Sequence, residues 1–216
     1  MSDVQDGESL SDQMRVRMGR SYQCFLLYKA LLYRNNIDIH DRIVIETNNF
    51  IFKRHSDFFV PVRDSLLTKA IIDLYIFFDK DNNNYNYHDL LKELKLKCHH
   101  TIYDDTEKKI EDLFEQVKLE KKYLTNYRHA DLAHDGKNKK SHKLSLEHIE
   151  SLFSTTQQVF NLINHHLEDS FTDFDIYNEN SAKDDINSLL RELNYGYEEF
   201  KRLLEVEEKN DLNYPR

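Results

Sequence analysis

Glycine and proline, which most tight turns require, are almost absent from this chain. Its 216 residues contain four glycines and two prolines, and beyond position 19 the only glycines are Gly136 and Gly196. This scarcity excludes glycine-rich phosphate-binding loops and the nucleophile elbow of α/β-hydrolases. It also leaves β-hairpins without their usual turns, so the sequence predicts an all-α fold.

Apolar residues recur at helical spacing along most of the chain. The pattern predicts helices over residues 21–34, 40–54, 57–79, 87–97, 104–133, 146–167 and 183–208. Asp104 and Glu107 have the spacing of a capping box, and Gly136 provides a helix stop. We expect a disordered or frayed N-terminus over 1–20, a helical bundle over 21–168, an acidic linker over 169–182 and a C-terminal amphipathic helix over 183–208.

The net charge of −9 is unevenly distributed. Between Lys118 and Lys143, eight Lys or Arg residues outnumber three acidic residues, an excess of five, so the other 190 residues carry −14. A local positive field attracts a polyanion even when the whole molecule is acidic. A solvated lysine-rich loop is the more frequent explanation of such a run. As an RNA-binding surface, the run would use Lys121, Lys122, Lys137, Lys139, Lys140 and Lys143.

The sequence carries no signal for a membrane, for secretion or for a metal. No apolar run approaches the roughly 18–20 residues that span a bilayer, and the N-terminal six residues are acidic where a secretory signal is basic. Cys24 and Cys98 stand alone, which is typical of a reducing compartment. The 11 histidines show no zinc-binding spacing. We therefore expect a cytoplasmic protein with no metal, no cofactor and no membrane contact.

One motif in the basic stretch suits RNA cleavage: Arg128-His129-Ala130-Asp131-Leu132-Ala133-His134. Transesterification by the 2′-hydroxyl of RNA needs a group that moves protons near neutral pH, as imidazole does. It also needs a cation on the phosphate, and guanidinium binds two oxygens at once. Arg34 and His40 have the same spacing, but they flank a helix-breaking turn outside the basic stretch. We therefore predict Arg128 and His134 as the catalytic pair.

The spacing of this pair also indicates how many copies of the chain form the site. Six residues along an ideal helix correspond to about 9 Å of rise and roughly 240° of rotation, so Arg128 and His134 do not share a helix face. In one copy they converge only if the helix unwinds near Ala133. Two copies that meet at a symmetric interface supply a cation from one chain and an imidazole from the other. The sequence therefore predicts a homodimer with both motifs in a shared groove.

Three stretches occur in an order and spacing typical of one superfamily of helical proteins. They are residues 58–67, the segments Phe77-Phe78-Asp79 and Asp89-Leu90-Leu91, and residues 127–135, which read Arg-polar-x-x-x-Ala-His-Asp from Arg128. Over about residues 20–170 the chain resembles the HEPN superfamily, and within it the AbiU-type abortive-infection branch of phage-defence proteins.

The resemblance implies a HEPN-like helical bundle with an additional C-terminal helix, a homodimer joined through the motif face, and metal-independent RNA cleavage in phage defence or as a toxin. It implies that Arg128 holds the scissile phosphate, that His134 is the catalytic acid/base and that His129 is a polar helper. Two positions depart from the family's pattern. Ile76 stands where relatives often have arginine, and no tyrosine lies two residues after His134, unlike HEPN toxins that are silenced by nucleotidylation there.

Two further functions are compatible with the same residues. The first is a non-catalytic HEPN-like dimer that binds RNA or a partner, such as the cognate antitoxin of a toxin–antitoxin system. The second is a helical scaffold that uses the apolar stripe of residues 183–208 for protein contacts. RNA cleavage that depends on His134 and Arg128 separates the enzyme from both.

Overall fold

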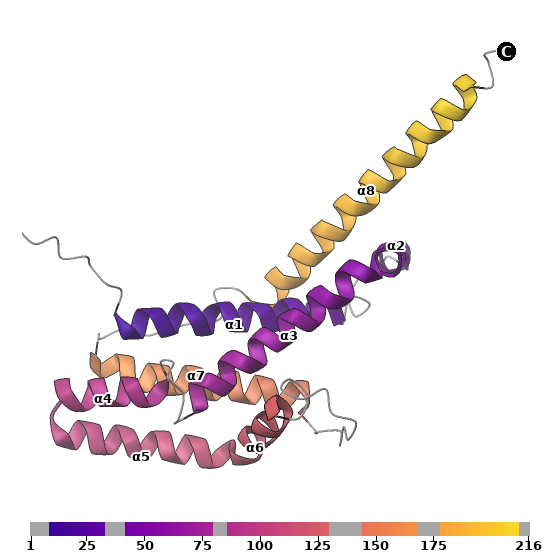
Figure 1. Ribbon diagram of the computed structural model, residues 1–216. Helices are drawn as coiled ribbons and strands as arrows, with labels where there is room; N and C mark the ends of the chain where they lie inside the picture. Colours follow the sequence, from indigo (N-terminus) through magenta and orange to yellow (C-terminus); the bar gives the residue numbers. More distant parts are fainter. Residues whose placement is uncertain (1–8, 33–41, 80–85, 130–143, 168–177, 212–216) are drawn as a thin grey trace, which may run out of the picture. The chain divides into compact units, whose positions relative to one another are not determined.

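The computed structural model describes residues 9–32, 42–79, 86–129, 144–167 and 178–211. These ranges contain helices and no strand, which confirms the predicted all-α fold. The helices, drawn in Figure 1, are α1 (Leu10–Leu32), α2 (Arg42–Arg54), α3 (Ser56–Phe78), α4 (Tyr87–Lys97), α5 (His100–Gln116), α6 (Lys118–Tyr127), α7 (Leu146–Leu167) and α8 (Glu179–Asp211).

The helices form two units. The motif unit consists of residues 1–25 and 67–176, and the C-terminal unit consists of residues 26–66 and 177–216. Helices α1 and α3 therefore contribute one end to each unit, whereas α4, α5, α6 and α7 belong to the motif unit and α2 and α8 to the C-terminal unit. The predicted domain boundaries stay a prediction.

Aromatic side chains hold the motif unit together. The Phe77 ring of α3 lies 5.9 Å from the Tyr87 ring of α4 and 6.1 Å from the Phe160 ring of α7. Phe114 of α5 lies 4.7 Å from Tyr87 and 5.4 Å from Phe78. Helices α4 and α5 run side by side with α7 along them (Figure 1). Because a buried ring of this size stabilises a fold by about 1.5–3 kcal/mol, this cluster fixes the position of α3 relative to α5 and α7.

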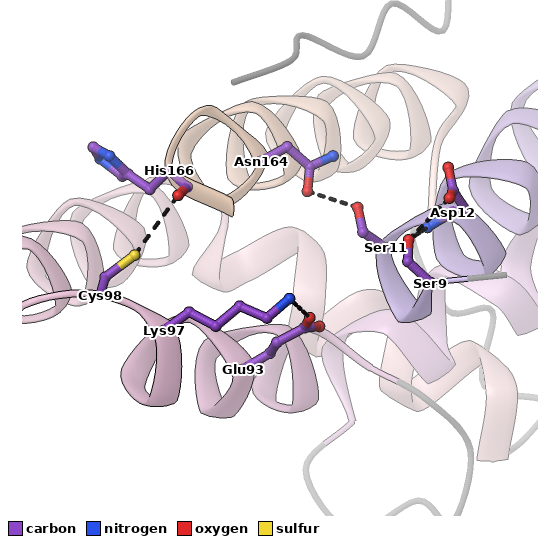
Figure 2. A network of polar contacts seen from close by, with 8 residues as sticks. All are labelled: Ser9, Ser11, Asp12, Glu93, Lys97, Cys98, Asn164 and His166. Carbon is purple, nitrogen blue, oxygen red and sulfur yellow. Dashed lines mark hydrogen bonds and ion pairs between the residues drawn. The ribbon is translucent and has the colours of Figure 1, made fainter. Parts of the chain in front are cut away.

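The N-terminal part of α1 corrects one sequence prediction. Residues 10–20, which we expected to be disordered or frayed, form the beginning of α1. Met14 and Met18 are 3% and 1% exposed, and the Ser11 hydroxyl donates a hydrogen bond to Asn164 of α7 at 2.8 Å (Figure 2). The methionines lie four residues apart and so share one helix face. Their burial stabilises a segment whose other residues are mostly polar.

The predicted single helix over 104–133 is divided in the structure. Its first part, α5, begins at His100 rather than at Asp104, because the His99 side chain caps it by accepting a hydrogen bond from the Thr101 N–H. Val117 then separates α5 from α6, with φ −111° and ψ 23°. Its side chain is only 3% exposed. The periodicity continues across the break because Val117 is buried, as are Ile110 of α5 and Leu124 of α6, each seven residues away.

The C-terminal unit is joined by contacts between α2 and α8. The Phe50 ring lies 5.7 Å from the Tyr197 ring, and the Arg54 guanidinium carbon lies 4.3 Å above that same ring. Helix α8 begins at Glu179, so it includes residues 179–182, which we predicted as linker. The side chain of Asn178 accepts hydrogen bonds from the next turn and so caps α8, and Ala182 is fully buried.

Candidate functional site

Helix α6 carries the described part of the predicted motif, Arg128 and His129, at its C-terminal end. It runs from Lys118 to Tyr127, and the backbone N–H of Arg128 is directed at the carbonyls of both Leu124 and Thr125. Arg128 caps the helix with φ −57° and ψ −45°, so its backbone is still right-handed helical. Arg128 and His129 therefore follow directly on the C-terminal end of α6.

The side chains of Arg128 and His129 both contact Tyr75 of α3. The guanidinium carbon of Arg128 lies 4.6 Å above the Tyr75 ring centre. The His129 ring meets the same ring edge-on, at 6.0 Å between centroids and 84° between planes. Nη1 of Arg128 lies 3.4 Å from Nδ1 of His129, and the guanidinium donates this contact when Nδ1 carries no proton. Three flat side chains therefore touch one another.

This cluster has the exposure that an anion-binding site requires. Arg128 and Tyr75 are half-buried, and His129 is exposed. An arginine whose planar face rests on an aromatic ring keeps N–H donors along its edges, and these donors fit the oxygens of a phosphate. The arrangement can bind one phosphate group beside an imidazole.

The other predicted site residues fall into two groups. Lys121 and Lys122 lie on α6, within the described residues. His134 and four of the predicted RNA-binding lysines, Lys137, Lys139, Lys140 and Lys143, lie outside them, as does the pair with the same spacing, Arg34 and His40. Among the predicted catalytic residues, the structure therefore shows Arg128 and His129 together.

Lys121 and Lys122 are neighbours in sequence with different surroundings. The ammonium of Lys121 lies 4.1 Å from the Phe114 ring centre and 5.1 Å from that of Phe78. Lys121 also lines a pocket of about 500 Å³, whose other lining residues are Tyr87, His88, Leu91, Glu107, Ile110, Glu111, Asp112, Phe114 and Glu115. The side chain of Lys122 is exposed. Lys122 is therefore placed for a partner in solution, whereas Lys121 packs within the protein.

The carboxylates of this pocket act on two tyrosines. Burial, followed by the charges of Glu111 and Glu107, raises the pKa of Tyr87 far above its usual value. The Tyr103 hydroxyl donates a hydrogen bond to Glu107 at 2.7 Å, and this bond raises the pKa of Tyr103 to about 12. Because the folded pKa is raised from 10, the stabilising effect is fully present below pH 10 and is lost as the pH rises towards 12. The pocket is thus an electronegative environment in which a lysine ammonium is well placed.

Tyr75 is the residue of the candidate site that sequence reasoning missed. It lies 53 positions before Arg128, in a helix whose apolar residues predict a buried core element. The neighbouring Ile76, one of the two positions that depart from the pattern implied by the resemblance, is half-buried. Tyr75 lies in the mainly apolar C-terminal part of α3, and an amphipathic aromatic residue there was the available signal.

In the described part of the chain, no three His, Cys, Asp or Glu side chains gather closely enough to hold a metal ion. None of the helices in the described ranges combines the length and the apolar character needed to cross a bilayer.

Comparison with known proteins identifies the family. The family model HEPN_AbiU2, described as AbiU2, matches residues 45–185, which is more than half of the chain and includes α3 to α7. No curated protein and no solved structure shows significant similarity. The match confirms the resemblance that residues 58–67, 77–91 and 127–135 indicated. The chain belongs to the AbiU2 family of HEPN proteins.

Proposed function

We propose that this protein is a metal-independent endoribonuclease that acts in phage defence or as a toxin. The observation that carries the proposal is the Tyr75–Arg128–His129 cluster, which places a guanidinium beside an imidazole. It occurs in a member of a HEPN family whose name refers to abortive infection. A cation for phosphate and an imidazole for proton transfer are the two groups that RNA transesterification requires.

In the proposed reaction, RNA supplies its own nucleophile, so the protein needs neither a metal nor a covalent intermediate. The 2′-oxygen attacks the adjacent phosphorus while an imidazole accepts the 2′-hydroxyl proton. The bond from phosphorus to the 5′-oxygen breaks, and the leaving oxygen takes up a proton. The products are a 2′,3′-cyclic phosphate and a 5′-hydroxyl. His134 is the acid/base, Arg128 balances the negative charge on the phosphate oxygens, and His129 assists.

We propose that the complete site forms in a homodimer. The sequence pattern supports this arrangement, since an ideal helix through residues 128–134 would place Arg128 and His134 about 240° apart. An isologous interface brings the two motifs together around a two-fold axis. Exposed Lys122 and the lysines between residues 137 and 143 extend the positive surface along the RNA backbone.

The test is incubation of the purified protein with total RNA and with tRNA, with and without excess chelator. We expect cleavage that persists in chelator, leaves 2′,3′-cyclic phosphate ends and is lost in His134→Ala. His40→Ala is the matched control, because His40 has the same spacing from an arginine, and this variant should cleave normally.

Other outcomes assign other functions. Salt-sensitive RNA binding without any product would indicate the non-catalytic dimer, and neither binding nor cleavage would indicate a scaffold. Cleavage that stops in chelator would contradict the metal-independent mechanism. A monomer of full activity in sedimentation and cleavage assays would contradict the shared site.

A further inference from the structure

Tyr75 contacts both described side chains of the motif, although it comes from a different helix. Its ring lies 4.6 Å from the Arg128 guanidinium carbon and 6.0 Å from the His129 ring centre. The motif alone assigns no function to this tyrosine. We propose that Tyr75 is a positioning residue, whose ring holds the Arg128 guanidinium in the orientation that binds the scissile phosphate. The inference rests on the proposed ribonuclease function and adds a residue to it.

The first argument concerns the freedom of an arginine side chain. Arg128 follows the last residue of α6, and a long side chain at a helix end has several rotatable bonds and many accessible rotamers. Cation–π attraction to the Tyr75 face restricts the guanidinium to one region. The edge contact between His129 and the same ring, together with the 3.4 Å approach of Nη1 to Nδ1, restricts it further. Catalysis depends on such placement, since a displacement of about 1 Å costs on the order of a hundredfold in rate.

The second argument concerns the rigidity of the helix that carries the tyrosine. In α3, Leu74 next to Tyr75 and Phe77 two residues after it are buried, at 0% and 1% exposed. Asp73, also 1% exposed, accepts a hydrogen bond from Nε of Arg17 at 3.0 Å and pairs with Lys69. The ring is therefore attached to a segment that is fixed on several sides, and functional groups are placed most accurately by rigid elements.

The third argument separates the ring from the hydroxyl. Both contacts to the motif are made by the Tyr75 ring. The Arg128 guanidinium lies over its face, and the His129 ring meets it edge-on. Phenylalanine provides the same face and nearly the same volume, so Tyr75→Phe should preserve positioning. Leucine fills part of the space but has no π face, so Tyr75→Leu should abolish it.

The experiment compares wild type, Tyr75→Phe, Tyr75→Leu, Arg128→Ala and the Tyr75→Leu/Arg128→Ala double variant in RNA cleavage. We expect kcat/KM to fall about 10- to 100-fold in Tyr75→Leu and to return to near wild type in Tyr75→Phe. The double variant should be no slower than Arg128→Ala, because the tyrosine acts through the arginine. Independent, multiplying losses would overturn the inference.

Tyr123→Leu is the matched control. Tyr123 is half-buried like Tyr75 and its ring also packs against a histidine, at 5.1 Å from the ring of His148. This variant removes a ring of the same kind from the motif unit and should leave kcat/KM unchanged. A loss equal to that of Tyr75→Leu would show a general effect of packing and would overturn the inference.

A second measurement does not depend on RNA. In the NMR spectrum, the ring of Tyr75 should shift the Arg128 Hε resonance upfield in wild type and Tyr75→Phe, and the shift should disappear in Tyr75→Leu. If wild type neither cleaves nor binds RNA, the proposed function fails while this shift still reports positioning. If wild type cleaves RNA and Tyr75→Leu matches it in rate and in Hε shift, only the inference about Tyr75 fails.

Discussion

Helix α6 places two cations on rings of α3, and their surroundings differ. Lys121 and Arg128 are seven residues apart, so they lie on nearly the same face of the helical path. Lys121 lies 5.1 Å from the Phe78 ring centre, and Arg128 lies 4.6 Å from that of Tyr75. Lys121 also packs on Phe114 in a pocket lined by several carboxylates, whereas Arg128 packs beside an exposed imidazole. Both cations are half-buried, but Lys121 lies among protein carboxylates, whereas Arg128 lies beside an exposed imidazole.

The comparison teaches that a cation–π contact alone does not indicate a functional site. At Lys121, protein carboxylates and rings already supply the groups that an ammonium favours, so the contact stabilises the helix packing. At Arg128, the planar guanidinium still has donors for an anion after one face rests on the ring. The lysine among carboxylates and the arginine beside an imidazole agree with this division.

The largest expected difference is in catalysis. Arg128→Ala should lower kcat/KM for RNA cleavage by about 10²–10³-fold, because it removes the cation that balances transition-state charge. Lys121→Ala should leave kcat/KM unchanged. Initial rates on one RNA substrate, with circular dichroism to check folding, measure both effects. Equal losses in the two variants would remove the distinction between the two cations.

An intermediate effect is expected in stability, where the variant at Lys121 should lose more than the variant at Arg128. Lys121→Ala should reduce the free energy of unfolding by about 1 kcal/mol, because a partly desolvated cation–π contact is lost. This corresponds to a fall of about 2–4 °C in Tm for a chain of this length. Arg128→Ala should cost less, because it loses one ring contact where Lys121→Ala loses two. Urea unfolding of both variants provides the measurement, and a larger cost for Arg128→Ala would reverse our assignment.

The smallest expected effect distinguishes adjacent lysines. Lys122→Ala should reduce the slope of log affinity against log salt concentration by about 0.7 for single-stranded RNA, the value for one lost phosphate contact. Lys121→Ala should leave the slope unchanged, since its ammonium packs on Phe114 and Phe78. Fluorescence anisotropy in a His134→Ala background measures binding without cleavage. A slope change in Lys121→Ala alone would show that its ammonium leaves the rings to contact RNA.

Much of the fold could be predicted from periodicity, because each helix buries one stripe of side chains. The expected helices over 57–79, 87–97 and 146–167 agree closely with α3, α4 and α7. Periodicity failed where a buried residue does not belong to a helix. Val117 is buried between two helices, and its apolar side chain conceals the break. At the N-terminus, Met14 and Met18 bury one narrow face, which their polar neighbours obscure in the sequence.

The candidate site could be predicted only in part. The spacing of charged and imidazole groups predicted Arg128 and His134, because chemistry can be read from residue types along one segment, and the family resemblance added His129. Tyr75 could not be found this way, since its contact with them is tertiary and spans 53 residues. The difference between Lys121 and Lys122 depends on which side of α6 packs against the other helices. The adjacent positions of the two lysines in the sequence do not reveal that side.

The interruption at Val117 isolates α6 from changes in the helix before it. In a continuous helix, one inserted residue turns every later side chain by about 100°, which would move Arg128 away from Tyr75. Because α5 ends at Gln116 and α6 begins at Lys118, the joint can absorb such a change. Relatives with a longer or shorter α5 can therefore keep the guanidinium on its ring, so the length of one helix can evolve without altering the angular alignment of the next.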